Sequence, residues 1–197
     1  MSAEWLTAAA TAGTFVVIAA SAIAAMFQIR YLRSSNQIAT LTDMRQTMDS
    51  PQFQAALAFV MEELPERLKD TELRRIFITR AAQGQRPLPA GFESVRSVAN
   101  FFTNIGILVR TGIVDRATVC YLWHDAVLRA WRCIAPVKAN FRALAGEDPW
   151  QNFEYLAVLC QDWVNRHPHG LYPQGVPRMP SPDLWPETKE RIHGDVT

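Results

Sequence analysis

The sequence lacks a large net charge, a cysteine framework and any recognisable catalytic motif. Twenty lysines and arginines against nineteen aspartates and glutamates leave a formal charge of +1, so no overall field draws nucleic acid to the protein. The three cysteines, Cys120, Cys133 and Cys160, are odd in number and lie in apolar helical patterns, which argues against a disulfide-stapled secreted domain and favours a reducing compartment. No phosphate-binding loop, dinucleotide fingerprint, zinc-protease motif or nucleophile elbow occurs. We therefore assign no catalytic, cofactor-binding or metal-binding residue and expect no cofactor and no nucleic-acid partner.

Strand patterns are also missing. No segment alternates apolar and polar residues with β-branched enrichment, whereas apolar residues recur at spacings of three and four. We expect an all-α fold: one N-terminal transmembrane helix continuing into a cytosolic bundle of roughly five or six helices, then an extended proline-rich tail. The expected parts are the anchor, a juxtamembrane helix, the helical domain and the tail, at residues 1–33, 34–50, 51–166 and 167–197.

The most apolar segment lies near the N-terminus. No charged side chain occurs from Trp5 to Ile29, and a helix of this length spans about 37 Å, enough to cross a hydrocarbon core of about 30 Å with some tilt. Trp5 and Tyr31 stand near its two ends, where aromatic rings favour the headgroup level. Arg30 and Arg33 follow it on one side only. The positive-inside rule then predicts a bacterial inner-membrane protein with its N-terminus outside and its C-terminal domain in the cytoplasm.

Two other interpretations of this segment stay open. Ala20-Ser21-Ala22 has the small-x-small form of a signal-peptide cleavage site, and Ala22-Ile23-Ala24 offers a second. Against cleavage, the first four residues carry no lysine or arginine, and the apolar run exceeds a typical signal-peptide core of about 7–15 residues. The remaining interpretation is a buried helix of a soluble protein. The length of the run favours the membrane anchor over both.

The same segment carries small residues at helical spacing. Ala9 and Gly13 are four residues apart, as are Ala20 and Ala24, so each pair lies on one helix face. Small faces let helix backbones approach closely in lipid, which predicts packing against another membrane protein or a second copy of the chain. Alanine-rich spans also insert alone, so this pattern by itself leaves both outcomes open.

Capping patterns predict the helix boundaries in the first half of the domain. Asp49-Ser50-Pro51 combines a capping side chain with proline at a first helical position, so a helix is expected to begin at Pro51 and to run to Pro65. A further helix is expected at residues 71–82. A glycine- and proline-containing loop is expected at residues 83–91.

Similar patterns mark the second half. The apolar segment at residues 92–112 predicts the central helix of the core. Asp115 is expected to cap the next helix, in which Pro136 predicts a kink or break close to Ala135. Asp148-Pro149-Trp150-Gln151 predicts that Asp148 caps the last helix.

A few residues could carry chemistry, but each has a structural interpretation that is favoured. Cys120 and His124 share a helix face, yet no further ligand or orienting group at suitable spacing accompanies them. His167 and His169 offer two imidazoles in the tail, too few for a strong metal site. The tryptophans of the helical segments are expected to pack in the core: Trp123, Trp131, Trp150 and Trp163.

Five stretches of the sequence resemble a known family. They read FQIRYLRSSNQ, DSPQFQAALAFV, VANFFTNIGILVRTGIVDRATV, WRCIAPVKANF and NFEYLAVL. Together they resemble the small bacterial proteins grouped as domain of unknown function 4760, over residues 15–165 and not over the tail. The resemblance implies one N-terminal span and a helical cytosolic domain. It implies no activity and no catalytic residue.

These observations favour a non-enzymatic interaction protein that serves as an accessory subunit of a membrane protein assembly, with membrane lipid and another membrane protein, or its own copy, as partners. The small-faced span, the aromatic-rich domain and the missing catalytic motif point in this direction. The alternative is a membrane-tethered effector or enzyme whose polar site is assembled from scattered residues of the helical domain.

Overall fold

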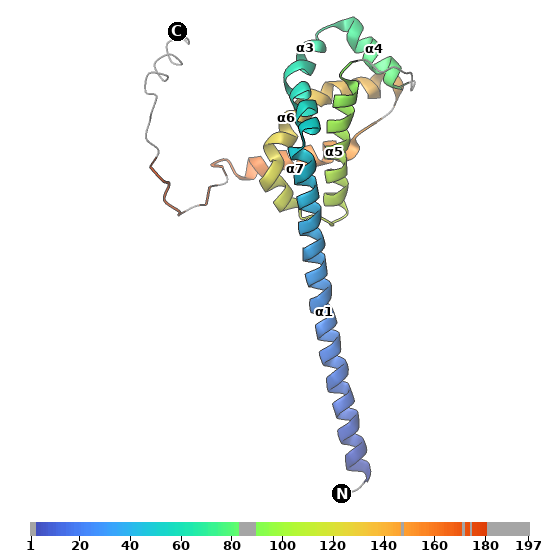
Figure 1. Ribbon diagram of the computed structural model, residues 1–197, viewed down its shortest axis with the longest axis vertical. Coiled ribbons are helices and arrows are strands. Elements are labelled where there is room, and N and C mark those ends of the chain that lie inside the picture. The colour runs from blue at the N-terminus through green and yellow to red at the C-terminus, as the bar shows by residue number, and fades with distance from the viewer. Residues whose placement is uncertain (1–2, 83–89, 147, 171, 174, 181–197) are drawn as a thin grey trace. The chain divides into compact units, whose positions relative to one another are not determined.

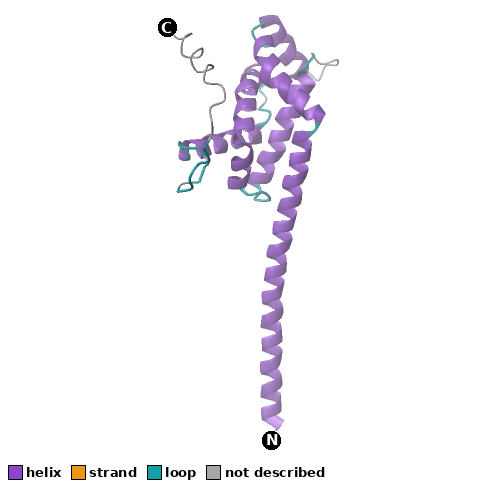
Figure 2. Ribbon diagram, turned by 60° about the vertical axis from the view of Figure 1, so that its left-hand side comes forward, coloured by secondary structure: helices purple, strands orange, loops and turns teal. Residues whose placement is uncertain are grey.

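The structure is a computed structural model that describes residues 3–82, 90–146, 148–170, 172–173 and 175–180. In these ranges the chain forms helices and no strand, which confirms the all-α prediction (Figure 2). The elements are α1 (Ala3–Asp49), α2 (Pro51–Ala58), the π-helical turn η1 (Phe59–Glu63), α3 (Leu64–Arg67), α4 (Thr71–Ala82), α5 (Phe92–Arg110), α6 (Arg116–Ala145) and α7 (Gln151–Arg166). The chain divides into two units, Met1–Arg166 and His167–Thr197.

Helix α1 is a single helix of 47 residues that joins the apolar segment to the domain without a break (Figure 1). The apolar stretch Thr11–Gln28 is not buried anywhere along its length. Among the described side chains of α1, those that reach the core lie in its C-terminal part, where Met44 is buried and Leu41 and Met48 pack beside it. The helix is therefore held at one end by the domain and projects from it at the other.

The core is built around α5, which packs on α2, α6 and α7. The fully buried ring of Phe102 stacks on Phe153 of α7, with 5.1 Å between centroids, and meets Phe53 of α2 edge-on at 6.4 Å. Trp131 of α6 contacts the same Phe153 ring edge-on at 5.1 Å. One aromatic cluster thus ties four helices together. All four tryptophans named above pack in or against the core, as predicted.

Local capping explains where α2 begins. The hydroxyl oxygen of Ser50 accepts the N–H of Phe53 at 3.3 Å, and Pro51 occupies the first turn, where no N–H is needed. This confirms the predicted start. Asp115 likewise accepts the N–H of Thr118 at 2.7 Å and caps α6 as predicted.

The predicted end at Pro65 is wrong. The chain stays helical through η1 and α3 as far as Arg67, because one turn widens before the proline. In that turn the N–H of Leu64 donates to the carbonyl of Phe59, five residues back. A proline ring collides with the carbonyl four residues earlier in a regular helix, and a π-turn relieves that collision.

Of the two outcomes predicted at Pro136, a kink or a break of the helix, the break does not occur. The helix is continuous from Arg116 to Ala145, although it changes direction along its length in Figure 1. The residues on both sides, Ile134 and Val137, are fully buried, so core packing holds the helix across the missing hydrogen bond. The side chain of Asn140 donates to the carbonyl of Pro136 at 2.9 Å.

The predicted cap of α7 is also wrong. The helix begins at Gln151. The carbonyl of Trp150 accepts hydrogen bonds from the N–H groups of Phe153 and Glu154, each at 3.1 Å. Trp150 has a positive φ of 59°, which is rare for a bulky residue. Its indole holds this conformation by donating to Asn100 at 3.1 Å and packing edge-on against Phe141. The carboxylate of Asp148 is used elsewhere, in an ion-pair cluster described below.

Candidate functional site

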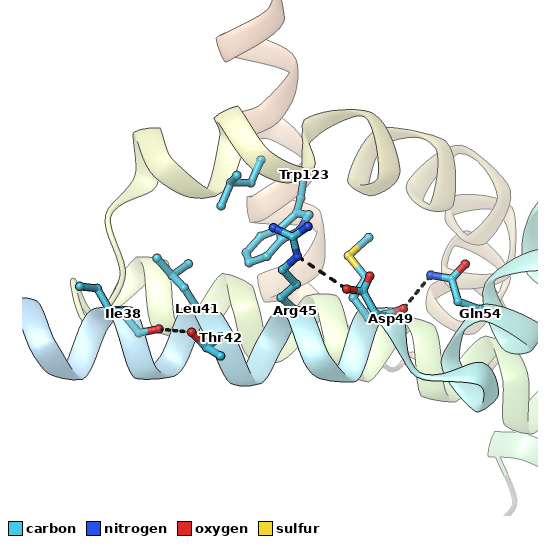
Figure 3. Close-up of a pocket in the computed structure, with 9 residues that line it drawn as sticks. Ile38, Leu41, Thr42, Arg45, Asp49, Gln54 and Trp123 are labelled. Carbon is cyan, nitrogen blue, oxygen red and sulfur yellow. Dashed lines mark hydrogen bonds and ion pairs between the residues drawn. The ribbon is translucent and has the colours of Figure 1, made fainter.

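A groove of about 540 Å³ opens between α1, the start of α2 and the first half of α6 (Figure 3). Its size falls in the range of known ligand and side-chain pockets. Nine residues line it: Ile38, Leu41, Thr42, Arg45, Met48, Asp49, Gln54, Leu122 and Trp123.

The 3.6-residue period of α1 builds one wall of the groove. Residues three and four apart share a helix face, so Ile38, Leu41, Arg45 and Met48 all turn toward α6. Across from them Trp123 is 9% exposed and forms an apolar base. Ile38 and Leu122 are 63% and 47% exposed. The groove therefore has an apolar interior with hydrophobic side chains left uncovered at its margin.

The polar side chains of the groove interact with groups that lie four to six residues away in the chain. Arg45 Nε lies 3.6 Å from Asp49 Oδ2, and both side chains are largely exposed. Gln54 Nε2 donates to the carbonyl of Met48 at 2.7 Å, and the Thr42 hydroxyl donates to the carbonyl of Ile38. These groups form a polar rim and do not converge on one point. Such a lining suits docking of a side chain or helix better than acid–base chemistry.

Cys120 and His124 do not form a nucleophile–base pair. His124 Nδ1 lies 2.9 Å from the backbone carbonyl of Cys120, so the ring is held by its own helix. The Cys120 thiol instead faces Cys160 of α7, with 3.8 Å between the sulfur atoms, and both side chains are buried. Donation to Cys120 together with burial raises the pKa of the Cys160 thiol. Among the described residues no three metal-ligating side chains gather.

An ion-pair cluster joins the end of α6 to α7. The carboxylate oxygens Asp148 Oδ1 and Glu154 Oε2 each lie 2.8 Å from the ammonium of Lys138. Arg142 donates to the same two oxygens at 2.5 and 2.7 Å. The buried ammonium of Lys138 is thus ion-paired with two carboxylates. Arg142 has the largest effect, and Lys138 the next largest, in holding the pKa of Asp148 far below its usual range.

Lys138 is the only charged side chain among the buried residues of the described chain, with 2% of its surface exposed. Sequence reasoning missed the cluster because its two carboxylates lie beyond the helix that carries the two cations. Helical spacing therefore does not relate the carboxylates to the cations. The only local signal was Lys138 and Arg142 at a spacing of four. The contact of Cys120 with Cys160, forty positions apart, left no signal at all.

The residues predicted to pack in the membrane lie on the free part of α1. Gly13, Ala20 and Ala24 are exposed, and no atom lies within 4 Å of the position a Cβ would take at Gly13. Tyr31 is 76% exposed. The other predicted residues have side chains outside the described part of the chain: Trp5, Ala9, Arg30 and Arg33.

Comparison with known proteins places the chain in a family. Residues 15–163 match the family described as Domain of unknown function (DUF4760). The chain belongs to this family. The match begins inside the apolar stretch of α1 and ends within α7, so the DUF4760 unit comprises the domain together with most of its projecting helix. All nine groove residues lie within it. No curated protein and no solved structure matches the chain.

Proposed function

We propose that this DUF4760 protein is a non-enzymatic, single-pass protein of the bacterial inner membrane and an accessory subunit of a membrane protein assembly. One observation carries the proposal. The stretch Thr11–Gln28 is long and apolar enough to cross a membrane, with a mean hydropathy of 1.6, and no part of it is covered by protein. An apolar helix of this size is stable only where lipid or another chain covers it.

The flanks of the span support an orientation. Arg30 and Arg33 follow it and Glu4 precedes it, which favours a cytoplasmic domain by the positive-inside rule. The unbroken course of α1 through Ala20-Ser21-Ala22 to the buried Met44 supports an anchor that stays attached. Cleavage there would release a domain whose first helix is cut in the middle.

Charge placed inside the span is expected to release the protein from the membrane. Ile18→Arg combined with Ala20→Arg puts two guanidinium groups near the middle of the span, where each costs about 2.5–3.5 kcal/mol on insertion scales. The full-length protein should stay in the pellet after alkaline extraction of membranes with its uncut mass, and the double variant should appear in the supernatant.

The matched control is Val158→Arg with Gln161→Arg, which adds the same charge to exposed positions of α7. This variant should remain in the pellet. Protease added to inside-out vesicles should remove a C-terminal tag that survives in intact spheroplasts. Uncut wild-type protein in the soluble fraction after gentle lysis would contradict the anchor.

The groove is the proposed contact with the assembly. It lies on the part of α1 that follows the span, within reach of a neighbouring helix leaving the same membrane, and its exposed Ile38 and Leu122 suit an apolar helix face. The titratable groups of the groove, Arg45 and Asp49, form an exposed pair at its rim, so the groove offers no converging set to support the enzymatic alternative.

Substitution in the groove is expected to remove the partner. Leu122→Arg places a charge on an exposed apolar margin, so the domain should fold while the contact is lost. Val158→Arg, on an exposed valine outside the groove, is the matched control. Affinity isolation in mild detergent should recover a stoichiometric membrane partner with wild type and Val158→Arg but not with Leu122→Arg. A wild-type chain that runs strictly alone in native mass spectrometry at high concentration would contradict an accessory role.

A further inference from the structure

The connection between α5 and α6 carries exposed apolar and basic side chains at the end of the domain from which α1 projects (Figures 1 and 2). We call it the loop surface and define it by Ile107, Arg110, Ile113 and Arg116. We propose that the loop surface binds the headgroups of anionic phospholipids and forms a second attachment of the domain to the bilayer. This inference rests on the membrane anchoring proposed above.

Its height above the membrane follows from helix geometry. Leu122 lines the groove together with Ile38, and α6 begins on the side of the groove nearer the N-terminal part of α1 (Figure 3). Arg116 lies six residues before Leu122, or about 9 Å along the helix. In Figure 3 the start of α6 lies beside the part of α1 that carries Ile38.

The distance from there to the bilayer is short. Five residues separate Ile38 from Arg33, which amounts to about 7 Å of helix. Headgroups add about 5–8 Å on each side of the hydrocarbon core. The loop surface therefore lies at the level of the headgroups when α1 spans the membrane.

The turn holds Ile113 in a fixed outward position. The N–H groups of Ile113 and Val114 both donate to the carbonyl of Leu108, at 3.0 and 3.2 Å. Val114 is buried and anchors the turn in the core, whereas Ile113 is 50% exposed and Ile107 is 39% exposed. The exposed isoleucine is thus presented by an ordered turn and not by a frayed end.

The charge around this turn complements an anionic surface. Arg110 contacts only the uncharged side-chain oxygen of Asn152, at 3.4 Å, and neither Arg110 nor Arg116 is in an ion pair with a carboxylate among the described residues. The carboxylate of Asp115 accepts the N–H and hydroxyl of Thr118 as the cap of α6 and interacts electrostatically with Arg116, so Arg110, Arg116 and Asp115 together leave one net positive charge at the turn. Two guanidinium groups beside an apolar tip suit phosphate headgroups better than the surface of a neutral protein.

Depth-dependent quenching in vesicles tests the inference on the full-length chain. Ile113→Cys, Ile76→Cys and Ala20→Cys are made in a Cys133→Ser background, because Cys120 and Cys160 are buried and the half-buried Cys133 is the remaining native thiol. Each variant is labelled with an environment-sensitive fluorophore and reconstituted with phosphatidylcholine alone or mixed with phosphatidylglycerol, with or without bromine near the headgroup. Ala20 reports the span, and Ile76 lies on α4 at the opposite end of the domain (Figure 1).

We expect brominated lipid to quench the label at 113 severalfold more strongly in phosphatidylglycerol vesicles than in phosphatidylcholine alone, and to leave the label at 76 unchanged. Arg110→Gln with Arg116→Gln should remove that difference. Quenching at 20 without quenching at 113 would overturn the inference and leave the anchor standing. Equal quenching at 113 in both lipids would overturn the assignment to anionic headgroups. A label at 20 that is not quenched would overturn the anchor itself.

Discussion

Alanine at position 106 is expected to destabilise the domain by about 2 kcal/mol or more, since overpacking of a tight core contact usually costs about 1–3 kcal/mol and sometimes more. A Cβ at Gly106 would lie 2.1 Å from the backbone carbonyl oxygen of Asn152 and 2.7 Å from its carbon. Backbone atoms cannot rotate away as a side chain can. Helices α5 and α7 would have to separate, which would open the stack of Phe102 on Phe153.

The higher helix propensity of alanine returns about 1 kcal/mol, so the steric cost must exceed that gain to be visible. Chemical unfolding of the full-length protein in detergent, followed by helical circular dichroism, measures the net effect. Gly13→Ala is the control, because Gly13 also lies in a helix and has no atom within 4 Å of its Cβ position. Equal unfolding midpoints for Gly106→Ala and Gly13→Ala would contradict the close crossing.

Neutralising both carboxylates of the ion-pair cluster is expected to have the second large effect. Asp148→Asn with Glu154→Gln would leave the ammonium of Lys138, 2% exposed, beside the guanidinium of Arg142 with no opposite charge. A buried charge without a partner is strongly destabilising, whereas an exposed ion pair contributes at most about 1 kcal/mol. The drop in unfolding midpoint should clearly exceed that of Asp125→Asn, which removes an exposed pair with Arg129.

A third substitution separates burial of charge from simple loss of contacts. Adding Lys138→Met to the double variant removes the unpaired ammonium and keeps the volume of the side chain, so it should recover much of the lost stability. If the triple variant is less stable than the double variant, packing around residue 138 matters more than its charge. The same unfolding measurement in detergent decides between the two.

The cluster also predicts how stability depends on pH. The pKa of Asp148 is far lower in the folded chain than the value of about 3.9 expected when unfolded, because Arg142 and Lys138 stabilise its charged form. Its contribution is therefore fully present above the unfolded pKa and is lost as the pH falls below it toward the folded pKa. Unfolding midpoints measured below about pH 4 should fall less steeply for Asp148→Asn than for wild type. Parallel slopes would contradict the assignment.

The starts of α2 and α6 and the apolar span were predictable because they depend on neighbours in the chain. Ser50 and Asp115 cap helices through hydrogen bonds to residues three positions ahead, a distance that sequence patterns capture well. The apolar stretch was also predictable, because the absence of charged residues is visible directly in the sequence. Family membership followed from the same local segments.

Tertiary packing decided the points on which local patterns were wrong. Pro65 is an ordinary helix breaker, yet a widened turn lets the helix continue past it. At Pro136 a kink or a break was predicted, and buried flanking residues keep α6 unbroken. Asp148 had the sequence position of a cap, but the buried ammonium of Lys138 and the guanidinium of Arg142 bind its carboxylate.

The groove and the contact between the two sulfur atoms also depend on tertiary packing and not on local sequence. Leu122 and Ile38 line one groove, and Cys120 meets Cys160 in the core, although each pair is far apart in the chain. The sequence by itself determined that the chain is helical, nearly neutral and carries one apolar helix, because these properties are sums over neighbouring residues. Only the folded structure decided which distant side chains face one another, because that depends on how whole helices cross.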